Sequence, residues 1–249
     1  MSGLILNWPP PPAQRELRGS QIHVWAASLQ PLPAQLSAWS NSLSPDEQVR
    51  AARFHFERDR DRFIAARGFL RAVLAGYTRL DSARLEFVYG PKGKPALAEA
   101  YGGAELFFNL AHSDDLALVA VTRLGNLGID VERLRPVSDA EGIAARFFSA
   151  RETAGWRALP EGERDLAFFN LWTRKEALLK ATGEGIGESL GAVEVAFLPG
   201  EPARLIRWAG DEAMARTWSL LALNPASDFV GALAVPAIGV QVDCWRWPG

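Results

Sequence analysis

The sequence predicts an α+β protein built from two similar halves. Apolar residues of Asp59–Ala75 recur at three- and four-residue steps, the period of an amphipathic helix, and a second helix is expected at about Leu166–Ala181. Each helix is followed in the same order by a strand, a loop, a strand, a turn and a strand. With 249 residues, of which 48% are hydrophobic and 22% charged, the chain can form one large or two small domains, each with a core. We expect two halves that meet near Gly125, residues 1–124 and 125–249.

Charge and composition exclude several classes of protein. Lys and Arg number 27 and Asp and Glu 29, so the net charge of -2 gives no field that would attract nucleic acid or an anionic membrane. The single cysteine, Cys244, cannot form an internal disulfide, and with three histidines it cannot supply an ordinary zinc cage. Met1–Trp8 lacks the pattern of a signal peptide, and the apolar stretch Phe229–Val242 is interrupted by Pro236. These features indicate a cytoplasmic protein.

The first half continues after its helix with a strand, a rigid loop and two further strands. The strand is expected at Leu85–Val88, and the Pro/Gly-rich loop at Gly90–Pro95 cannot extend it. Two more strands, Leu106–Leu110 and Leu116–Thr122, flank Ala111–Asp115, which is rich in polar and turn-forming residues. We interpret Ala111–Asp115 as a loop of the type that carries chemistry.

The second half repeats this order in pattern, although not in residue identity. A Gly-rich turn, Gly183–Gly191, precedes a strand at Val193–Phe197 and a Pro/Gly loop at Pro199–Pro202. Two strands, Trp218–Leu223 and Phe229–Val235, then flank a polar turn.

Two carboxylates share one face of a strand near the start of the second half. Leu116–Thr122 and Leu127–Glu132 are separated by a Gly-Asn turn and are expected to form a hairpin. Side chains alternate along a strand, so Asp130 and Glu132 lie roughly 7 Å apart on one face. Mg²⁺ prefers carboxylate, water and phosphate oxygens, and would relieve the repulsion between the two. The alternative is a solvated strand edge whose charges pair with neighbouring arginines, Arg133 and Arg135.

The second helix places an acid and a base along one stripe. Trp172, Glu176 and Lys180 follow one another at steps of four residues. Lys175 is one step round the helix and is expected to pair with solvent or substrate. The alternative is a surface Glu-Lys pair worth about 0.3 to 0.5 kcal/mol, with Trp172 in the core.

Two further features suit phosphate groups. His112 could donate a hydrogen bond to a phosphate or act as a base, although a lone histidine is more often structural. Seven arginines lie within Arg50–Arg71 against three acidic residues, and guanidinium groups bind phosphate in bidentate fashion. For most of these arginines we favour a solvated helix face.

Five motifs taken together resemble a known family. Gly128–Glu132 and Phe169–Lys180 match the G-I-D-x-E and W-x-x-K-E-x-x-x-K signatures of the 4'-phosphopantetheinyl transferase superfamily, specifically its Sfp (surfactin-synthetase-activating) type. Upstream segments resemble the coenzyme A binding segments of that family, so that the resemblance covers most of Ser44–Gly187. These segments are Gly93–Pro95, Asn109–Ser113 and the region of Arg62.

The resemblance implies a pseudo-symmetric α+β monomer, each half a small antiparallel sheet packed with a long helix, with coenzyme A in the cleft between halves. It implies transfer of the 4'-phosphopantetheine arm of coenzyme A to a serine of an apo acyl or peptidyl carrier protein, with release of adenosine 3',5'-bisphosphate. By matching position, Asp130, Glu132 and Glu176 would be the Mg²⁺ ligands, and Glu176 is also a candidate general base.

The same resemblance implies the coenzyme A contacts. His112 and Lys180 would contact the pyrophosphate. Arg62 and Arg50 would contact the 3'-phosphate end, and Lys94 the nucleotide region. Mg²⁺ with Lys and His donors would stabilise the charge that builds on the phosphate oxygens during transfer.

Two residues depart from the family pattern, and two alternatives remain. Ala111 stands where a phosphate-binding serine is frequent, so Ser113 or a backbone N–H would replace it. Glu47 stands where a lysine is common, which weakens the 3'-phosphate contact or moves it to Arg50 and Arg53. A Mg²⁺-dependent nucleotide hydrolase would release adenosine bisphosphate without a carrier, and a binding module would release nothing.

A basic and apolar patch would suit the acidic helix of a carrier protein. We place it at residues 142–162, although two of its phenylalanines could equally belong to the core. The residues in question are Phe147, Phe148, Arg151 and Trp156.

Overall fold

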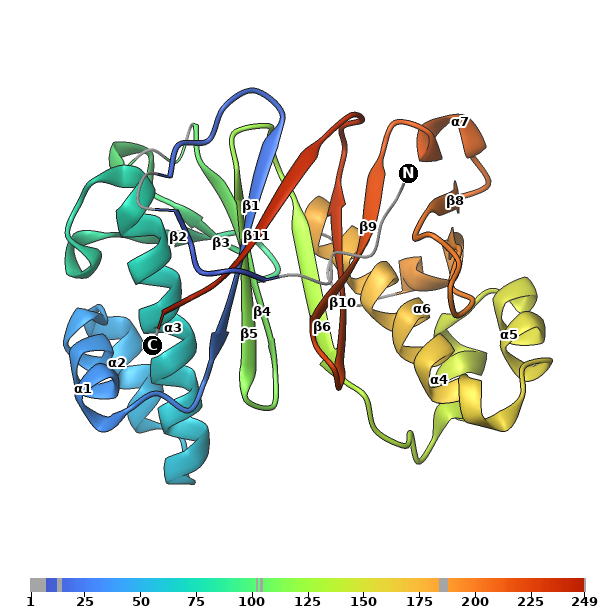
Figure 1. Ribbon diagram of the computed structural model, residues 1–249, viewed down its shortest axis with the longest axis horizontal. Helices are drawn as coiled ribbons and strands as arrows, with labels where there is room; N and C mark the ends of the chain where they lie inside the picture. The colour runs from blue at the N-terminus through green and yellow to red at the C-terminus, as the bar shows by residue number, and fades with distance from the viewer. Residues whose placement is uncertain (1–7, 13–14, 102, 104, 184–187, 249) are drawn as a thin grey trace.

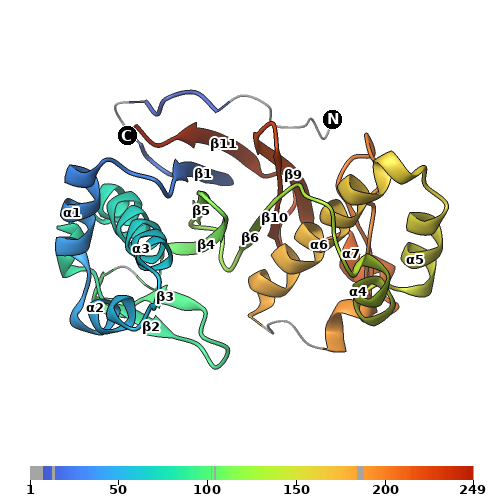
Figure 2. The same ribbon diagram turned by 90° about the horizontal axis from the view of Figure 1, so that it is seen from below.

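Two long helices lie on opposite sides of the strands in the computed structural model (Figure 1), which describes residues 8–12, 15–101, 103, 105–183 and 188–248. They are α3 (Glu57–Thr78) and α6 (Glu161–Thr182), and both predicted helices are therefore confirmed and longer than expected. Figure 2 shows the strands between the two groups of helices. The other helices are α1 (Pro33–Ser42) and α2 (Pro45–Ala52) beside α3, α4 (Ala140–Phe147) and α5 (Ala150–Arg157) beside α6, and α7 (Glu212–Ala215), which contacts β8.

The strands form two main sheets and two small hairpins. The first sheet has the order β11-β1-β5-β4 and the second the order β6-β10-β9, while β2 pairs with β3 and β7 with β8. The strands of the first half are β1 (Gln21–Ser28), β2 (Phe87–Tyr89), β3 (Pro95–Leu97), β4 (Phe107–Ser113) and β5 (Leu116–Thr122). Those that follow are β6 (Gly128–Arg133), β7 (Val193–Val195), β8 (Leu205–Trp208), β9 (Ser219–Ala226), β10 (Phe229–Val235) and β11 (Gln241–Arg246).

The two halves repeat one another in element order and in sheet order. In each half a strand and two short helices precede the long helix, a short hairpin and a longer hairpin. The strand order β1-β5-β4 matches β6-β10-β9. The last strand, β11, pairs in parallel with β1, from Gln21 opposite Gln241 to Ala26 opposite Arg246, and so joins the first sheet. The pseudo-symmetric α+β fold is confirmed, and the division at residues 124 and 125 stays a prediction.

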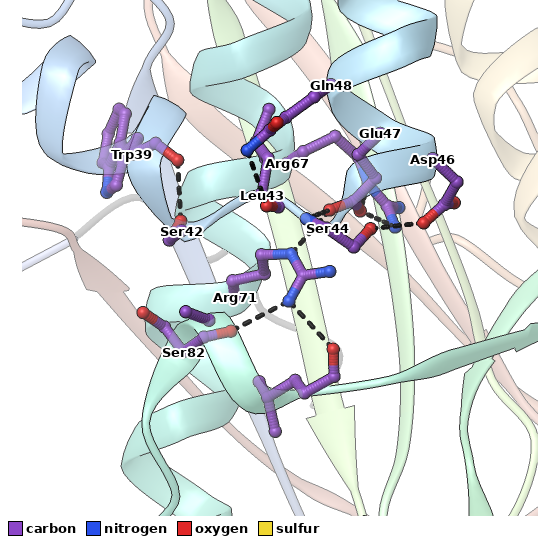
Figure 3. A network of polar contacts seen from close by, with 12 residues as sticks. Trp39, Ser42, Leu43, Ser44, Asp46, Glu47, Gln48, Arg67, Arg71 and Ser82 are labelled. Atoms are coloured by element: carbon purple, nitrogen blue, oxygen red, sulfur yellow. Dashed lines mark hydrogen bonds and ion pairs between the residues drawn. The ribbon is translucent and has the colours of Figure 1, made fainter.

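The repeat also includes an acidic residue and its basic partner, which the sequence pattern did not indicate. Glu47 in α2 and Glu152 in α5 are the third helical residues after Ser44 and Ser149, whose backbone N–H groups donate to them at 3.0 and 2.9 Å. Each carboxylate is buried and accepts a hydrogen bond from the long helix of its own half. The donors are Arg71 Nε at 2.6 Å from Glu47 and Lys175 Nζ at 2.6 Å from Glu152 (Figure 3 shows the first).

Three apolar clusters form the core. One lies between α3 and the first sheet and one between α6 and the second sheet. The third lies between the two sheets and contains Val24 of β1, Leu118 of β5, Ile129 of β6 and Leu233 of β10. Burial of this third cluster joins the halves, because apolar surface from both sheets leaves water together.

The expected hairpin of Leu116–Thr122 with Leu127–Glu132 is wrong. β5 pairs with β1 and β4, whereas β6 pairs with β10, from Gly128 opposite Ala234 to Arg133 opposite Phe229. The Gly-Asn segment thus connects two sheets and does not form a hairpin turn. Strand pairing depends on packing with distant strands as well as on the local sequence.

The expected loop Ala111–Asp115 is also wrong in extent. β4 runs to Ser113, so His112 lies on a strand, and the turn consists of Asp114 and Asp115, with Asp114 at φ +48°. Other strand predictions also need shifts, from Leu85–Val88 to Phe87–Tyr89, from Val193–Phe197 to Val193–Val195 and from Trp218–Leu223 to Ser219–Ala226. Part of the expected turn Gly183–Gly191 falls outside the described residues.

No helix among the described residues has both the length and the apolar character needed to cross a membrane.

Candidate active site

The site begins on β6, where two carboxylates lie on the face opposite the core. Ile129 and Val131 belong to the apolar cluster between the sheets, as the alternation predicts. Asp130 is buried, and burial raises the pKa of its carboxyl to about 6, although Lys180 acts in the other direction. Glu132 lies at the half-buried end of the strand, 3.6 Å from the Arg135 guanidinium.

Helix α6 brings an acid and a base to these carboxylates. The Nζ atom of Lys180 donates to Asp130 Oδ1 at 2.6 Å. Glu176 is 5% exposed, and burial followed by the nearby Asp130 raises the pKa of its carboxyl to about 7. The simple surface Glu-Lys pair is therefore excluded, because Lys180 bonds to a strand of the sheet and Glu176 is buried.

Trp172, the third residue of the stripe, lies beside an open cavity of about 270 Å³. Its ring stacks on Phe168 with 6.4 Å between centroids, and the cavity is also lined by Glu132 and Ile143. The stripe therefore runs from a partly apolar cavity to the carboxylates.

Two buried oxygens of this cluster lack a hydrogen-bond partner within the described residues. They are Asp130 Oδ2 and Glu176 Oε1. Buried polar atoms are normally paired, so such oxygens indicate a place for a cation or a donor from a ligand. As the side chains stand, the described part of the chain contains no group of three His, Cys, Asp or Glu side chains close enough to hold a metal ion.

Two side chains of β4, Asn109 and Ser113, connect the halves at the site. The sequence alone assigns no role to Asn109. Asn109 Oδ1 accepts the backbone N–H of Ile129 at 2.8 Å, and Ser113 Oγ accepts that of Arg133 at 3.2 Å. Ser113 also donates to Glu132 Oε2 at 2.7 Å. Both residues occupy the matched segment Asn109–Ser113, but only the contact of β4 with β6 across the two sheets reveals their role.

His112 and Arg62 lie at the first half's side of the site. Loss of hydration lowers the pKa of His112, and the charges of Lys180 and Arg62 lower it further, which favours a neutral imidazole at neutral pH. Arg62 of α3 is 3.9 Å from Asp114, and its buried Nε has no partner among the described residues. The charges of Arg62 and Lys180 thus both act on the His112 side chain.

Arg50 lies at the end of α2, in a shallow surface depression. Its guanidinium is 5.4 Å from the Phe63 ring, and Arg53 and Phe54 line the same depression. Within the described residues, no hydrogen bond joins Arg50 to the carboxylate cluster.

Lys94 differs from the expectation that it contacts a nucleotide. Its Nζ donates to the carbonyl oxygens of Leu127 at 2.9 Å, Lys180 at 2.6 Å and Ala181 at 3.4 Å. An ammonium group has three N–H donors, so these carbonyls occupy them.

The expectation that Lys175 pairs with solvent or substrate is wrong because its side chain is buried. Lys175 is fully buried, bonded to Glu152 and to the carbonyl oxygens of Leu190 and Val193, and does not face solvent or substrate. Glu47, which stands where the family often has a lysine, is buried as well. It is 2% exposed and pairs with Arg67 and Arg71, so these two arginines are not solvated (Figure 3).

The expected carrier patch is smaller than the sequence indicated. Phe148 and Trp156 are 6% and 4% exposed and pack against Phe168 in the core. Phe147 is partly buried beside Trp172, and Arg151 is exposed.

Fold and site together define a two-half α+β enzyme whose acidic centre, with an adjacent lysine, lies where the halves meet. The family model of the 4'-phosphopantetheinyl transferase superfamily matches residues 126–234, and that of the 4'-phosphopantetheinyl transferase N-terminal region matches residues 27–123. The 4'-phosphopantetheinyl transferase HetI of Nostoc sp. is 42% identical over 97% of this chain and 98% of its own.

Two further relatives carry the same description. The 4'-phosphopantetheinyl transferase psf-1 of Bacillus pumilus is 30% identical over 89% of this chain and 94% of its own. The 4'-phosphopantetheinyl transferase Sfp of Bacillus subtilis is 29% identical over 61% of this chain and 66% of its own. This chain belongs to the 4'-phosphopantetheinyl transferase superfamily and is an enzyme that modifies carrier proteins with phosphopantetheine.

Proposed function

We propose that the protein transfers the 4'-phosphopantetheine group of coenzyme A to a serine hydroxyl of an apo acyl or peptidyl carrier protein, with Mg²⁺ bound by Asp130, Glu132 and Glu176. The observation that carries the proposal is the pair of buried carboxylates, Asp130 and Glu176, beside Lys180, each with an oxygen that has no partner among the described residues and each within the field of Glu132, in a chain of this family. Adenosine 3',5'-bisphosphate is the second product.

The chemistry of the residues fits Mg²⁺. This ion takes oxygen ligands, and Asp130 Oδ2 and Glu176 Oε1 are buried oxygens without a hydrogen-bond partner within the described residues. The charges of Asp130 and Glu132 raise the pKa of Glu176, and that of Glu132 also raises the pKa of Asp130, which reflects negative charge that a cation would balance. When bound, Mg²⁺ supplies positive charge to the pyrophosphate oxygens of coenzyme A.

Lys180 and His112 are proposed to bind the pyrophosphate. Lys180 is held by Asp130 at 2.6 Å, so its position is fixed before substrate arrives. A neutral His112 imidazole retains one N–H donor for a phosphate oxygen. Such preorganised donors stabilise the charge that develops on the oxygens as the group is transferred.

The transfer exchanges one oxygen for another at the phosphorus that carries the pantetheine arm. The serine oxygen forms a bond to this phosphorus, the bond to the bridging oxygen breaks, and adenosine 3',5'-bisphosphate leaves with the electron pair. The serine proton goes to a base, for which Glu176 is our candidate, directly or through a water molecule.

The nucleotide end is assigned to two arginines. Arg62 and Arg50 are proposed to contact the 3'-phosphate, because guanidinium groups suit phosphate oxygens. The unpartnered Nε of Arg62 supports this assignment. Lys94 is left out of this set, because its N–H groups already have carbonyl partners.

Replacement of Glu176 tests the carboxylate site. Glu176→Gln keeps the shape of the side chain but removes its charge, so transfer should fall by at least about a hundredfold, the usual loss when a proton acceptor is removed. The matched control is Glu163→Gln, an exposed position in the first turn of the same helix, which should transfer at the wild-type rate. Wild-type turnover in Glu176→Gln would contradict both roles of this residue.

The carrier requirement separates the transferase from a nucleotide hydrolase. The proposal expects adenosine 3',5'-bisphosphate to appear only when an apo carrier protein is present. Release at the same rate without the carrier would favour a hydrolase that uses the same three carboxylates.

We further propose that the enzyme acts in the cytoplasm as a monomer without nucleic-acid or membrane partners. Support comes from the near-neutral net charge of -2 and the buried, free Cys244, which suits a reducing compartment.

A further inference from the structure

Lys94 connects the first half of the protein to two segments of the second half. It lies in the turn between β2 and β3, next to Gly93 at φ +78°. Its Nζ donates to Leu127 O, one residue before β6 begins, and to Lys180 O and Ala181 O in the last turn of α6. The Lys94 side chain, which belongs to the first half, thus holds the beginning of β6 and the end of α6, the two elements that carry the candidate site.

The end of α6 is a favourable place for this ammonium group. The last carbonyl groups of a helix have no partner within the helix, and they form the negative end of its dipole. Gly183, in the left-handed conformation at φ +79°, closes the helix by donating from its N–H to Leu179 O. Lys94 supplies donors to the two carbonyls that follow.

The binding is to carbonyl dipoles and not to an opposite charge. Among the described residues, no carboxylate lies within ion-pair distance of Lys94. Burial lowers the pKa of its ammonium group to about 8. Three hydrogen bonds to backbone carbonyl oxygens therefore hold this partly buried cation in position.

Gly128 shows how closely the two segments approach at this point. A Cβ atom at Gly128 would lie 2.0 Å from Ala177 O and 2.4 Å from Ala181 N. The backbone of β6 therefore passes directly against the last turns of α6, with Lys94 bridging the adjoining carbonyls. Two residues further along β6, Asp130 accepts the hydrogen bond from the Lys180 side chain.

We propose that Lys94 is a positioning residue for phosphopantetheine transfer, which clamps the start of β6 to the end of α6 and so holds Lys180 and Asp130 in their catalytic arrangement. The inference rests on the proposed function of the site and assigns Lys94 a structural role in transfer in place of a nucleotide contact. Lys94 acts through backbone atoms and does not touch the reacting groups.

The variant Lys94→Met keeps the aliphatic stem and removes the three donors. Displacement of catalytic groups by about 1 Å can cost roughly a hundredfold in rate, so we expect kcat to fall by about tenfold or more. The inhibition constant of adenosine 3',5'-bisphosphate, which carries the whole nucleotide end, should stay unchanged. Lys92→Met, an exposed lysine of the same turn, is the matched control and should retain wild-type kcat and inhibition.

The opposite pattern would overturn the proposal. If Lys94 contacts the nucleotide, the inhibition constant and the KM for coenzyme A rise together while kcat stays at the wild-type value. A Lys94→Met variant with wild-type values of all three constants would also overturn it.

A measurement on the wild-type protein avoids dependence on the folding of the variant. The chain has four lysines, at positions 92, 94, 175 and 180, so the ¹⁵N signals of their ammonium groups can be assigned. The clamp predicts a Lys94 ammonium signal that is protected from exchange with water and unchanged by adenosine 3',5'-bisphosphate. A signal that exchanges as fast as that of Lys92, or that shifts strongly with the nucleotide, would contradict the clamp even if no transfer is found.

Discussion

At the scale of single residues, His23 is a buried titratable group of β1 that is not among the candidate site residues. Its Nδ1 is 2.8 Å from the Tyr77 hydroxyl, which also accepts a hydrogen bond from Trp25 Nε1 at 2.9 Å. The hydroxyl therefore donates to an unprotonated Nδ1. The His23 ring also packs edge-on against Trp245 of β11, and burial lowers the pKa of His23 to about 4.

This shift predicts a loss of stability in acid. Between about pH 6.5 and pH 4 the unfolded chain binds a proton at His23 that the folded protein does not. The free energy of unfolding should therefore decrease as the pH is lowered through this window, by ~3 kcal/mol in total from this residue. The full contribution is present above pH 6.5.

Urea unfolding of the wild type and of His23→Gln across this window measures the contribution. The comparison isolates His23, because the raised pKa values of Asp130 and Glu176 act with the opposite sign and are shared by both proteins. Parallel pH profiles for the two proteins would show that His23 is protonated in the folded state.

Ser113 is predicted to orient a metal ligand. Its hydroxyl donates to Glu132 at 2.7 Å and accepts the N–H of Arg133 at 3.2 Å. Loss of a partner that orients a ligand typically weakens metal binding about 10- to 100-fold. For Ser113→Ala we expect the Mg²⁺ concentration for half-maximal transfer to rise by about tenfold, with the rate at saturating Mg²⁺ near that of the wild type. An unchanged Mg²⁺ dependence would contradict this role.

The candidate site residues that could be grouped from the sequence are those whose spacing is local. Asp130 and Glu132 alternate along one strand, and Glu176 and Lys180 are one helical turn apart, so period alone places each pair on one face. The roles of Glu47, Lys94 and Lys175 could not be predicted in this way, because their partners lie between 15 and 87 residues away in the chain.

At the scale of elements, one short helix of each half, α2 and α5, is joined to the long helix of that half by a buried ion pair. Glu47 accepts from Arg67 and Arg71, and Arg71 also donates to the carbonyl oxygens of Ser82 and Leu85 at 2.9 Å (Figure 3). Arg67 further reaches the Tyr89 hydroxyl of β2 at 3.2 Å. The network therefore joins α2, α3 and the hairpin that carries Lys94.

Removal of the Glu47 charge should destabilise the fold strongly. Breaking one partner of a buried ion pair leaves the other charges uncompensated and typically costs about 3–5 kcal/mol. Glu47→Gln should lower the free energy of unfolding by about this amount in urea, whereas Glu99→Gln at an exposed position should change it by less than about 0.5 kcal/mol. A loss below about 1 kcal/mol for Glu47→Gln would show that the network contributes little.

The helices and most strands could be predicted because their signals are local, whereas the pairing of β6 could not. The segment between β5 and β6 has the composition of a hairpin turn, yet β6 pairs with β10 about a hundred residues later. The pairing of β11 with β1 is a contact of the same kind, between the two ends of the chain. The residues of a turn carry no information about how distant strands pack. This packing decides which strand β6 or β1 pairs with.

At the scale of the whole molecule, the site depends on the contact between the halves. β6 and α6 provide the carboxylates and Lys180, while β4 and the β2–β3 turn hold them through Ser113 and Lys94. The apolar cluster between the two sheets holds these elements against one another. The second half carries the proposed metal ligands and Lys180, while the first half positions them and supplies His112, Arg62 and Arg50 for the proposed phosphate contacts.

The central claim is tested most directly by the intact mass of an apo acyl or peptidyl carrier protein after incubation with this enzyme, coenzyme A and Mg²⁺. The account predicts a gain equal to one phosphopantetheine group, lost when Mg²⁺ is removed and absent with Glu176→Gln. An unchanged carrier mass across several carrier proteins, or a full gain in the absence of Mg²⁺, would contradict it.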